Sequence, residues 1–163
     1  MRLSDVPLRA ITGAFVLNSG LTKLRGGPEA AEGVHGFATA AYPQFKRLRP
    51  EQFTKMLAAG EIALGAALLT PMIPPALAGA GLTAFSAGLL GLYFKVPGMH
   101  EENTLKPTEQ GIGIAKDSWL LGIGLSLLLE GLTDRTRKGL GATWAASGCR
   151  RRPGWSRRSC SRW

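Results

Sequence analysis

Apolar residues gather in four long segments of the chain, and most polar residues lie between them. The segments run from about 8 to 24, 55 to 72, 75 to 94 and 111 to 132. From Ile62 to Phe94 the chain contains no Asp, Glu, Lys, Arg or His. A bilayer span needs about 20 mostly apolar residues, so this stretch can hold two spans. The pattern predicts four membrane-spanning helices.

Prolines divide the long uncharged stretch at one place. Pro71, Pro74 and Pro75 stand close together there, and proline breaks a helix because it lacks the backbone N–H and clashes with the preceding turn. We therefore expect two antiparallel spans joined by a short turn. Successive antiparallel spans give up-down-up-down connectivity. The predicted fold class is all-α, an integral membrane four-helix bundle over residues 1–138.

The segment between the first and second spans is long and mixed in polarity. Within it, residues 28–41 are expected to form a short interfacial helix, because apolar residues such as Val34 and Phe37 recur at helical spacing. Arg9 and Lys23 bound the uncharged part of the first span. Their long cationic side chains are expected to reach the lipid headgroups. A cleaved signal peptide is not favoured, because the region before a cleavage site would be too long and polar.

Small residues recur every four positions on each segment, and helices in lipid associate where small residues let their backbones approach. We therefore expect these stripes to face neighbouring helices. The stripes are Ala10, Ala14, Asn18 and Thr22; Ala59, Ala63 and Ala67; Ala76, Ala80, Ala84 and Gly88; and Ser118, Gly122 and Ser126.

Polar residues on three different spans are expected at a similar depth. At a rise of 1.5 Å per residue, Asn18, Glu61 and Asp117 each lie about 9 Å from the same membrane face. Lys23 and Lys116 lie nearer that face and are expected to pair with the two acids. Ionisable groups inside spans are expensive and mark functional sites, so these five residues form the predicted ligand-binding set. The expected site is a polar cavity covered by the two long connecting loops.

The same five residues also allow a structural interpretation, in which polar contacts between helices fix their register. The sequence has no Ser-His-Asp signature, Walker loop or dinucleotide fingerprint, so no catalytic residue is predicted. His35 and His100 stand apart from any carboxylate or cysteine cluster, and no metal site is predicted.

The C-terminal tail of the chain is strongly basic. The formal net charge is +9, and six arginines lie within residues 150–163, together with Cys160. No recognition motif accompanies the charge, so nucleic acid is not a predicted partner. Residues 139–163 have no periodicity and are expected to be disordered; their composition also suggests an out-of-frame extension of a GC-rich gene. Both termini are expected on one side of the membrane, and the cytoplasmic side is favoured over its opposite.

Three parts of the sequence resemble the DoxX family of bacterial membrane proteins. The first span is similar over Arg9–Leu24 (RAITGAFVLNSGLTKL), the following loop over Phe37–Pro43 (FATAAYP), and the second span over Gly60–Leu69 (GEIALGAALL). The resemblance covers about residues 8–132. It implies a four-span bundle in the bacterial inner membrane. The family takes its name from a membrane subunit associated with thiosulfate:quinone oxidoreductase, and other members resemble partners of thiol-stress enzymes.

The resemblance implies an accessory or anchoring subunit of a membrane redox system, with no demonstrated enzymatic chemistry. No cofactor is expected within the chain, and a quinone is the candidate ligand. Residues 8–132 contain no cysteine, which argues against thiol chemistry by the chain itself. Besides the lipid bilayer, the candidate partners are a redox enzyme and a second copy of the chain. Two further hypotheses stay open: a quinone or lipid-like ligand bound near Asn18, Glu61 and Asp117, and a small transporter in which Glu61 or Asp117 carries a proton.

Overall fold

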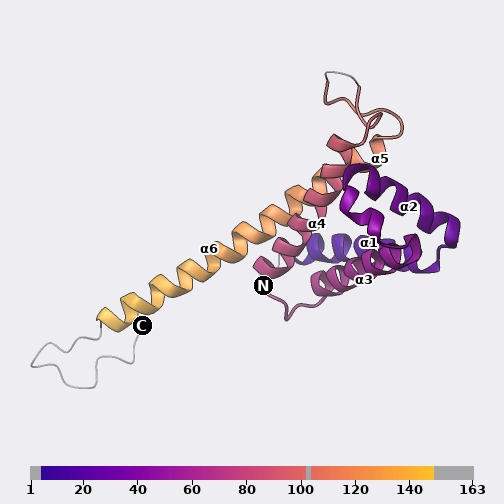
Figure 1. Ribbon diagram of the computed structural model, residues 1–163. Helices are drawn as coiled ribbons and strands as arrows, with labels where there is room; N and C mark the ends of the chain where they lie inside the picture. The colour runs from indigo at the N-terminus through magenta and orange to yellow at the C-terminus, as the bar shows by residue number, and fades with distance from the viewer. Residues whose placement is uncertain (1–4, 102–103, 149–163) are drawn as a thin grey trace, which may run out of the picture. The chain divides into compact units, whose positions relative to one another are not determined.

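The computed structural model describes residues 5–101 and 104–148, with side chains up to residue 134. Within these residues the chain is helical and has no strand, only an isolated bridge between His100 and Pro107. The all-α prediction is confirmed. The elements are α1 (Asp5–Arg25), α2 (Pro28–Ala41), the 3-10 helix η1 (Pro43–Arg47), α3 (Pro50–Leu69), α4 (Pro75–Lys95), α5 (Ile112–Ala115) and α6 (Ser118–Gly148) (Figure 1).

The chain falls into two units, and the candidate site described below lies in the first. The first unit runs from Met1 to Gly131, and the second from Leu132 to Trp163. In the second unit the structure describes only the continuation of α6 up to Gly148.

Prolines start three of the helices, as expected for a residue that lacks the N–H left unpaired at a helix start. They are Pro28 in α2, Pro50 in α3 and Pro75 in α4. The predicted helix over 28–41 is confirmed as α2, and the predicted proline turn separates α3 from α4.

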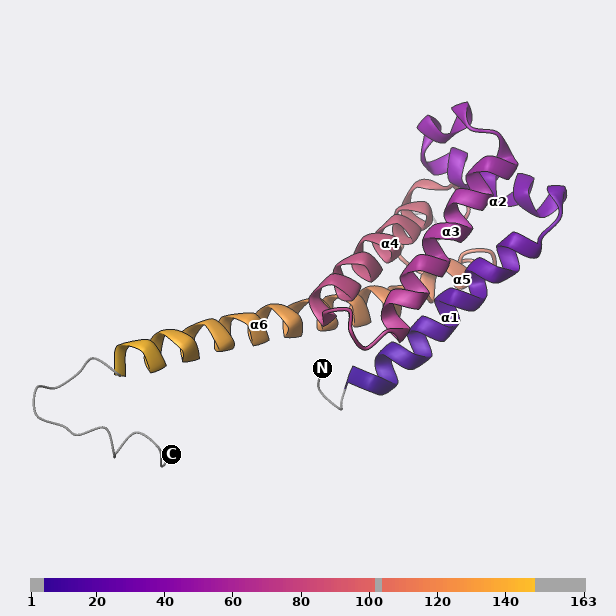
Figure 2. The same cartoon turned by 90° about the horizontal axis from the view of Figure 1, so that it is seen from below.

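The helices α1 and α3 pack side by side with their backbones in close contact (Figure 2). A Cβ atom added at Gly65 would lie 2.6 Å from the backbone nitrogen of Leu17, and one at Gly20 would lie 2.8 Å from the carbonyl oxygen of Ala58. Neither distance leaves room for a side chain, so glycine sets the separation of the two helices.

The helices α4 and α6 form a second close pair inside the first unit. A Cβ atom added at Gly79 would lie 2.5 Å from the backbone nitrogen of Leu128, and one at Gly124 would lie 2.8 Å from that of Thr83. Apolar side chains from the two pairs meet in one core, whose buried members are Val16, Leu68, Ala78, Leu82, Leu120 and Leu127.

The predicted small-residue stripes are wrong on most of their length. Ala10, Ala14, Asn18 and Thr22 are all exposed, and so are Gly122 and Ser126. A step of four residues turns 40° past a full circle at 3.6 residues per turn, so a strict four-residue stripe leaves the contact face. The buried positions instead alternate steps of three and four, as in Thr54, Ala58, Glu61, Gly65 and Leu68.

Arg9 does not reach outward from its helix as predicted. Its side chain is only 1% exposed, and its guanidinium donates hydrogen bonds to four carbonyl oxygens at the end of α3 and in the turn after it. The acceptors are Leu68 (2.9 Å), Ile73 (3.0 Å), Ala67 (2.9 Å) and Thr70 (2.9 Å). The last carbonyls of a helix have no intrahelical partner, and Arg9 supplies one from α1.

The predicted fourth span, 111–132, is not one continuous helix. The short helix α5 ends at Ala115, and α6 begins at Ser118 after a turn at Lys116 and Asp117. The helix α6 then continues through Gly148, so the expectation of disorder is wrong for residues 139–148. The rest of the predicted tail, 149–163, lies outside the described residues.

Two helical segments are long and apolar enough to cross a membrane. They are Pro75–Lys95 and Ile112–Asp134, and only a minority of their residues are buried. Within the described ranges, the helices α1 and α3 do not meet the same criterion of length and hydropathy.

Candidate functional site

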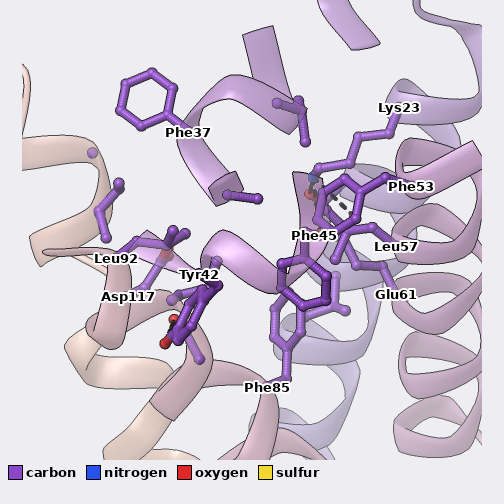
Figure 3. A pocket seen from close by; sticks show the side chains of 18 of the residues that line it. Lys23, Phe37, Tyr42, Phe45, Phe53, Leu57, Glu61, Phe85, Leu92 and Asp117 are labelled. Carbon is purple, nitrogen blue, oxygen red and sulfur yellow. Dashed lines mark hydrogen bonds and ion pairs between the residues drawn. The ribbon is translucent and has the colours of Figure 1, made fainter. Parts of the chain in front are cut away.

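A cavity of about 1050 Å³ lies within the first unit. It is lined by residues of α1, α2, η1, α3, α4 and α5 and by Leu120 near the start of α6. Most of the lining is apolar and much of it is aromatic (Figure 3). The aromatic residues are Phe15, Phe37, Tyr42, Phe45, Phe53 and Phe85. The structure therefore has a cavity where the sequence predicts one, but its wall is mostly apolar rather than polar.

The segment α2–η1 supplies one wall of the cavity and is held by ring contacts. The ring of Phe45 lies 5.0 Å from that of Phe53 on α3, and the His35 ring lies 5.5 Å from the same Phe53 ring. His35 Nε2 also lies 3.0 Å from the carbonyl oxygen of Phe45. These contacts join α2, η1 and α3 into one wall. The second long loop, residues 96–110, which was also predicted to cover the site, contributes no lining residue.

Tyr42 ties the same wall to α4. Its hydroxyl donates a hydrogen bond to the carbonyl oxygen of Gly88 at 3.1 Å, and the ammonium of Lys95 lies 4.4 Å from its ring centroid. The tyrosine hydroxyl occupies the space where a side chain at Gly91 would begin. A glycine at position 91 is therefore what lets Tyr42 lie against α4.

Lys23 and Glu61 form an ion pair in the cavity wall, as predicted. Lys23 Nζ lies 2.9 Å from each carboxylate oxygen of Glu61 and 2.8 Å from Ser19 Oγ. The Glu61 side chain is 3% exposed and that of Lys23 is 24% exposed. An ammonium group has three N–H donors, and the three contacts use all of them. The charges of Lys23 and Glu61 therefore compensate each other.

Asp117 enters the cavity from the turn between α5 and α6. Figure 3 shows it on the opposite side of the view from the Lys23–Glu61 pair. It is partly buried and lies within electrostatic range of both Lys23 and Glu61. Among the residues that the structure describes, no side chain or backbone group hydrogen-bonds to its carboxyl group. Asp117 is thus the acidic group in the wall whose lone pairs remain available.

The structure brings three of the five predicted site residues to the cavity. Lys23, Glu61 and Asp117 line it, whereas Asn18 and Lys116 are exposed and do not. Adjacent helical residues point about 100° apart. Asn18 therefore points away from the cavity, whereas its neighbour Ser19 lines it. The prediction that Lys116 pairs with an acid is also wrong.

The aromatic lining was not predicted from the sequence, because the prediction of a site rested only on polar residues at one depth. Tyr42 and Phe45 lie in a segment without an apolar repeat, so periodicity could not assign them to a cavity. The one available signal was the density of aromatic residues in the connection before α3.

Within the described ranges, no group of three or more His, Cys, Asp or Glu side chains is arranged to hold a metal ion. His35 and His100 each bind a backbone oxygen instead.

Comparison with protein-family models, with curated proteins and with solved structures finds no match for this chain. The function is therefore inferred from the cavity and its residues.

Proposed function

We propose that the chain is a multi-pass membrane protein that binds a quinone or another lipid-like molecule in the cavity. The observation that carries the proposal is the cavity itself, which combines a large apolar wall with one ion pair and one further carboxyl group. Ligand pockets are typically about 300–1000 Å³ and hold a few polar groups in a mostly apolar lining. A volume of about 1050 Å³ suits an elongated apolar molecule with a polar head.

Exposed apolar side chains support a bilayer as the surroundings of the helices. Ile11 is 73% exposed and Phe15 is 58% exposed on α1, and Leu77 is 62% exposed on α4. Water would make such a surface costly, whereas acyl chains would not. In the proposed arrangement α1 and α3 complete a four-helix, up-down-up-down bundle with the two apolar segments, in the bacterial inner membrane.

The resemblance to the DoxX family adds a role to this proposal. An accessory or anchoring subunit of a membrane redox system would have reason to hold a quinone beside an enzyme partner. The carbonyl or hydroxyl group of a quinone could lie against the ion pair of Lys23 and Glu61. Its tail could pack against the aromatic rings of the cavity wall.

The proton-coupled transporter has less support from the geometry. A proton carrier has to release and take up its proton during the cycle, but Glu61 is held by an ammonium group on both of its oxygens. Asp117 alone would have to carry the proton.

Filling the cavity tests the proposal. Gly88 lines the cavity and Gly60 does not, and a Cβ atom added at either meets nothing within 4 Å. Neither position has a clash with an added Cβ atom, and thermal unfolding in detergent checks that Gly88→Phe and Gly60→Phe are folded. We expect decylubiquinone, as a quinone probe, and dodecanol, as a lipid-like probe, to bind the wild-type protein and Gly60→Phe in native mass spectrometry. Binding of both should fall about tenfold in Gly88→Phe, as for a loss of about 1.4 kcal/mol.

The two probes also separate the two ligand classes. Binding of decylubiquinone alone would identify a quinone site. Binding of dodecanol alone would identify a lipid-like ligand and exclude a quinone as the ligand. Equal binding to all three proteins, or no binding of either probe, would overturn the proposed cavity function.

A further inference from the structure

The hydrogen-bonding groups of the cavity define which head group it can accept. Lys23 is the cation of the lining, and its three donors are directed at Ser19 and at both oxygens of Glu61. The Tyr42 hydroxyl donates a hydrogen bond to the carbonyl oxygen of Gly88. The positively charged and phenolic donors of the wall are thus already engaged within the protein.

The acceptors of the wall are not engaged to the same extent. In the described part of the chain, no group donates to the Asp117 carboxyl, which reaches the cavity from the turn between α5 and α6. Gln44 also lines the cavity, and its amide offers both donors and acceptors. Gln44 therefore does not decide between head groups, whereas Asp117 favours a ligand that donates.

Charge favours the same kind of head group. The ionisable groups of the lining are Lys23, Glu61 and Asp117, one basic and two acidic. When all three are ionised, the ion pair cancels and one carboxylate is left over in a mostly apolar wall. Asp117 is partly buried, and a carboxylate drawn out of water is stabilised by a partner charge or a donor; a cationic head would supply both. An anionic head would add a second negative charge to the leftover carboxylate, and the donors left in the lining to meet it are neutral, the Gln44 amide and the Ser19 hydroxyl.

The aromatic lining is compatible with a cation as well. The face of an aromatic ring is negative and attracts an ammonium group. Phe37, Tyr42, Phe85 and Leu92 line the same cavity as Asp117. In the view of Figure 3, Tyr42 and Leu92 are drawn on the same side as Asp117. An apolar tail beyond the head would meet these and the remaining apolar residues.

We propose that the cavity binds an amphiphile whose head is a protonated amine, with the head on Asp117 and the apolar chain along the aromatic wall. This inference rests on the proposed function, because it assumes that the cavity takes a lipid-like ligand. It names the head group that the cavity selects.

Three probes with the same twelve-carbon chain test the selection. Dodecylamine, dodecanol and dodecanoate carry a cationic, a neutral and an anionic head at neutral pH. Each is titrated into the purified full-length protein in neutral detergent, and the bound fraction is measured by native mass spectrometry. We expect dodecylamine to bind about tenfold more tightly than dodecanol, equivalent to about 1.4 kcal/mol, and dodecanoate to bind more weakly than both.

Two variants assign the preference to one carboxyl group. Asp117→Asn keeps the shape of the side chain and removes its charge, and it should bring dodecylamine to within about twofold of dodecanol while dodecanol binding is unchanged. Glu109→Gln removes an exposed carboxylate that does not line the cavity, and it should retain the full preference. Thermal unfolding of each variant in the same detergent checks that both are folded.

The outcomes separate this inference from the proposed function. If dodecanol binds and Gly88→Phe excludes it, but dodecylamine has no advantage or Asp117→Asn keeps the advantage, the amine inference is wrong and the cavity function stands. Binding of dodecanoate as tight as that of dodecylamine would also overturn the amine inference. If none of the three probes binds, the amine inference is wrong, and the proposed function fails with it unless decylubiquinone binds.

Discussion

Arg9 connects the start of the chain to the end of α3 through a single side chain. Its guanidinium is planar and carries five N–H donors, which suits several carbonyl oxygens arranged around one helix end. A lysine has three donors on one nitrogen and could not reach the same set. The position therefore requires arginine and not merely a positive charge.

We predict that Arg9→Met destabilises the protein by about 2–4 kcal/mol, because hydrogen bonds from charged groups contribute about 1.5–3 kcal/mol and buried carbonyls would lose their donor. Arg9→Lys should lie between the wild type and Arg9→Met. The free energy of unfolding in detergent is the measurement. Arg25→Met, at an exposed position on the same helix, should change it by no more than about 0.5 kcal/mol. Equal effects at the two positions would contradict the proposed role of Arg9.

Individual residues were predictable from the sequence where chemistry alone constrained them. The Lys23–Glu61 pair was predicted because Lys23 lies nearer the membrane face than Glu61 but within reach of it, and neither charge is tolerated alone in an apolar region. Asn18 carried no such constraint, since an amide can lie on either side of a helix. Arg9 was misassigned because its acceptors are backbone carbonyls, which leave no trace in the sequence.

The helix pairs α1–α3 and α4–α6 depend on glycines that face the backbone of the partner helix. At Gly79 the three nearest atoms to an added Cβ all belong to the backbone of α6, at 2.5–2.9 Å. Backbone atoms cannot rotate away as a side chain can, so a methyl group there has to push the helices apart.

We expect Gly79→Ala to lower the free energy of unfolding by about 1–3 kcal/mol, the usual cost of overpacking. Gly122 is the matched control on the partner helix, because an added Cβ meets nothing within 4 Å there. Gly122→Ala should raise the free energy of unfolding by about 0.5–1 kcal/mol, since alanine favours the helix over glycine. Unfolding in detergent compares the two variants, and a stabilising effect at position 79 would refute the close contact.

The order and type of the elements were largely predictable, but their contact faces were not. Proline positions and the interruption of the apolar segments fixed the helices and the turn between α3 and α4. The contact faces failed because alanine and glycine are abundant on every side of these helices, so that several stripes satisfy a four-residue spacing equally well. Only positions spaced alternately three and four residues apart, as the buried residues are in the structure, stay on one face of a helix.

At the scale of the whole molecule, the central expectation is that successive long helices cross the bilayer in opposite directions. The two loops that flank α4 contain well-exposed positions, Met72 at 88% and Leu105 at 75%. If α4 spans the membrane, these positions lie on opposite sides of it.

Single cysteines placed at these positions test that expectation. Cys149 and Cys160 are the two cysteines of the chain, and serine at both gives a background without thiols. In intact cells a membrane-impermeant maleimide should label only one of Met72→Cys and Leu105→Cys, and permeabilised cells should label both. Lys46→Cys, in the connection between α2 and α3, should behave like Leu105→Cys. Labelling of Met72→Cys and Leu105→Cys from the same side would contradict the proposed topology.

The Arg9 contacts have a consequence for how the chain is made. The four carbonyl acceptors lie 58 to 64 positions after Arg9, so the ribosome completes α1 well before they exist. If the chain enters a membrane as proposed, the guanidinium has only Asp5, water or phosphate as partners until the turn after α3 emerges. Assembly of this bundle is therefore expected to pause with its first helix shallow and to finish only when the third helix arrives.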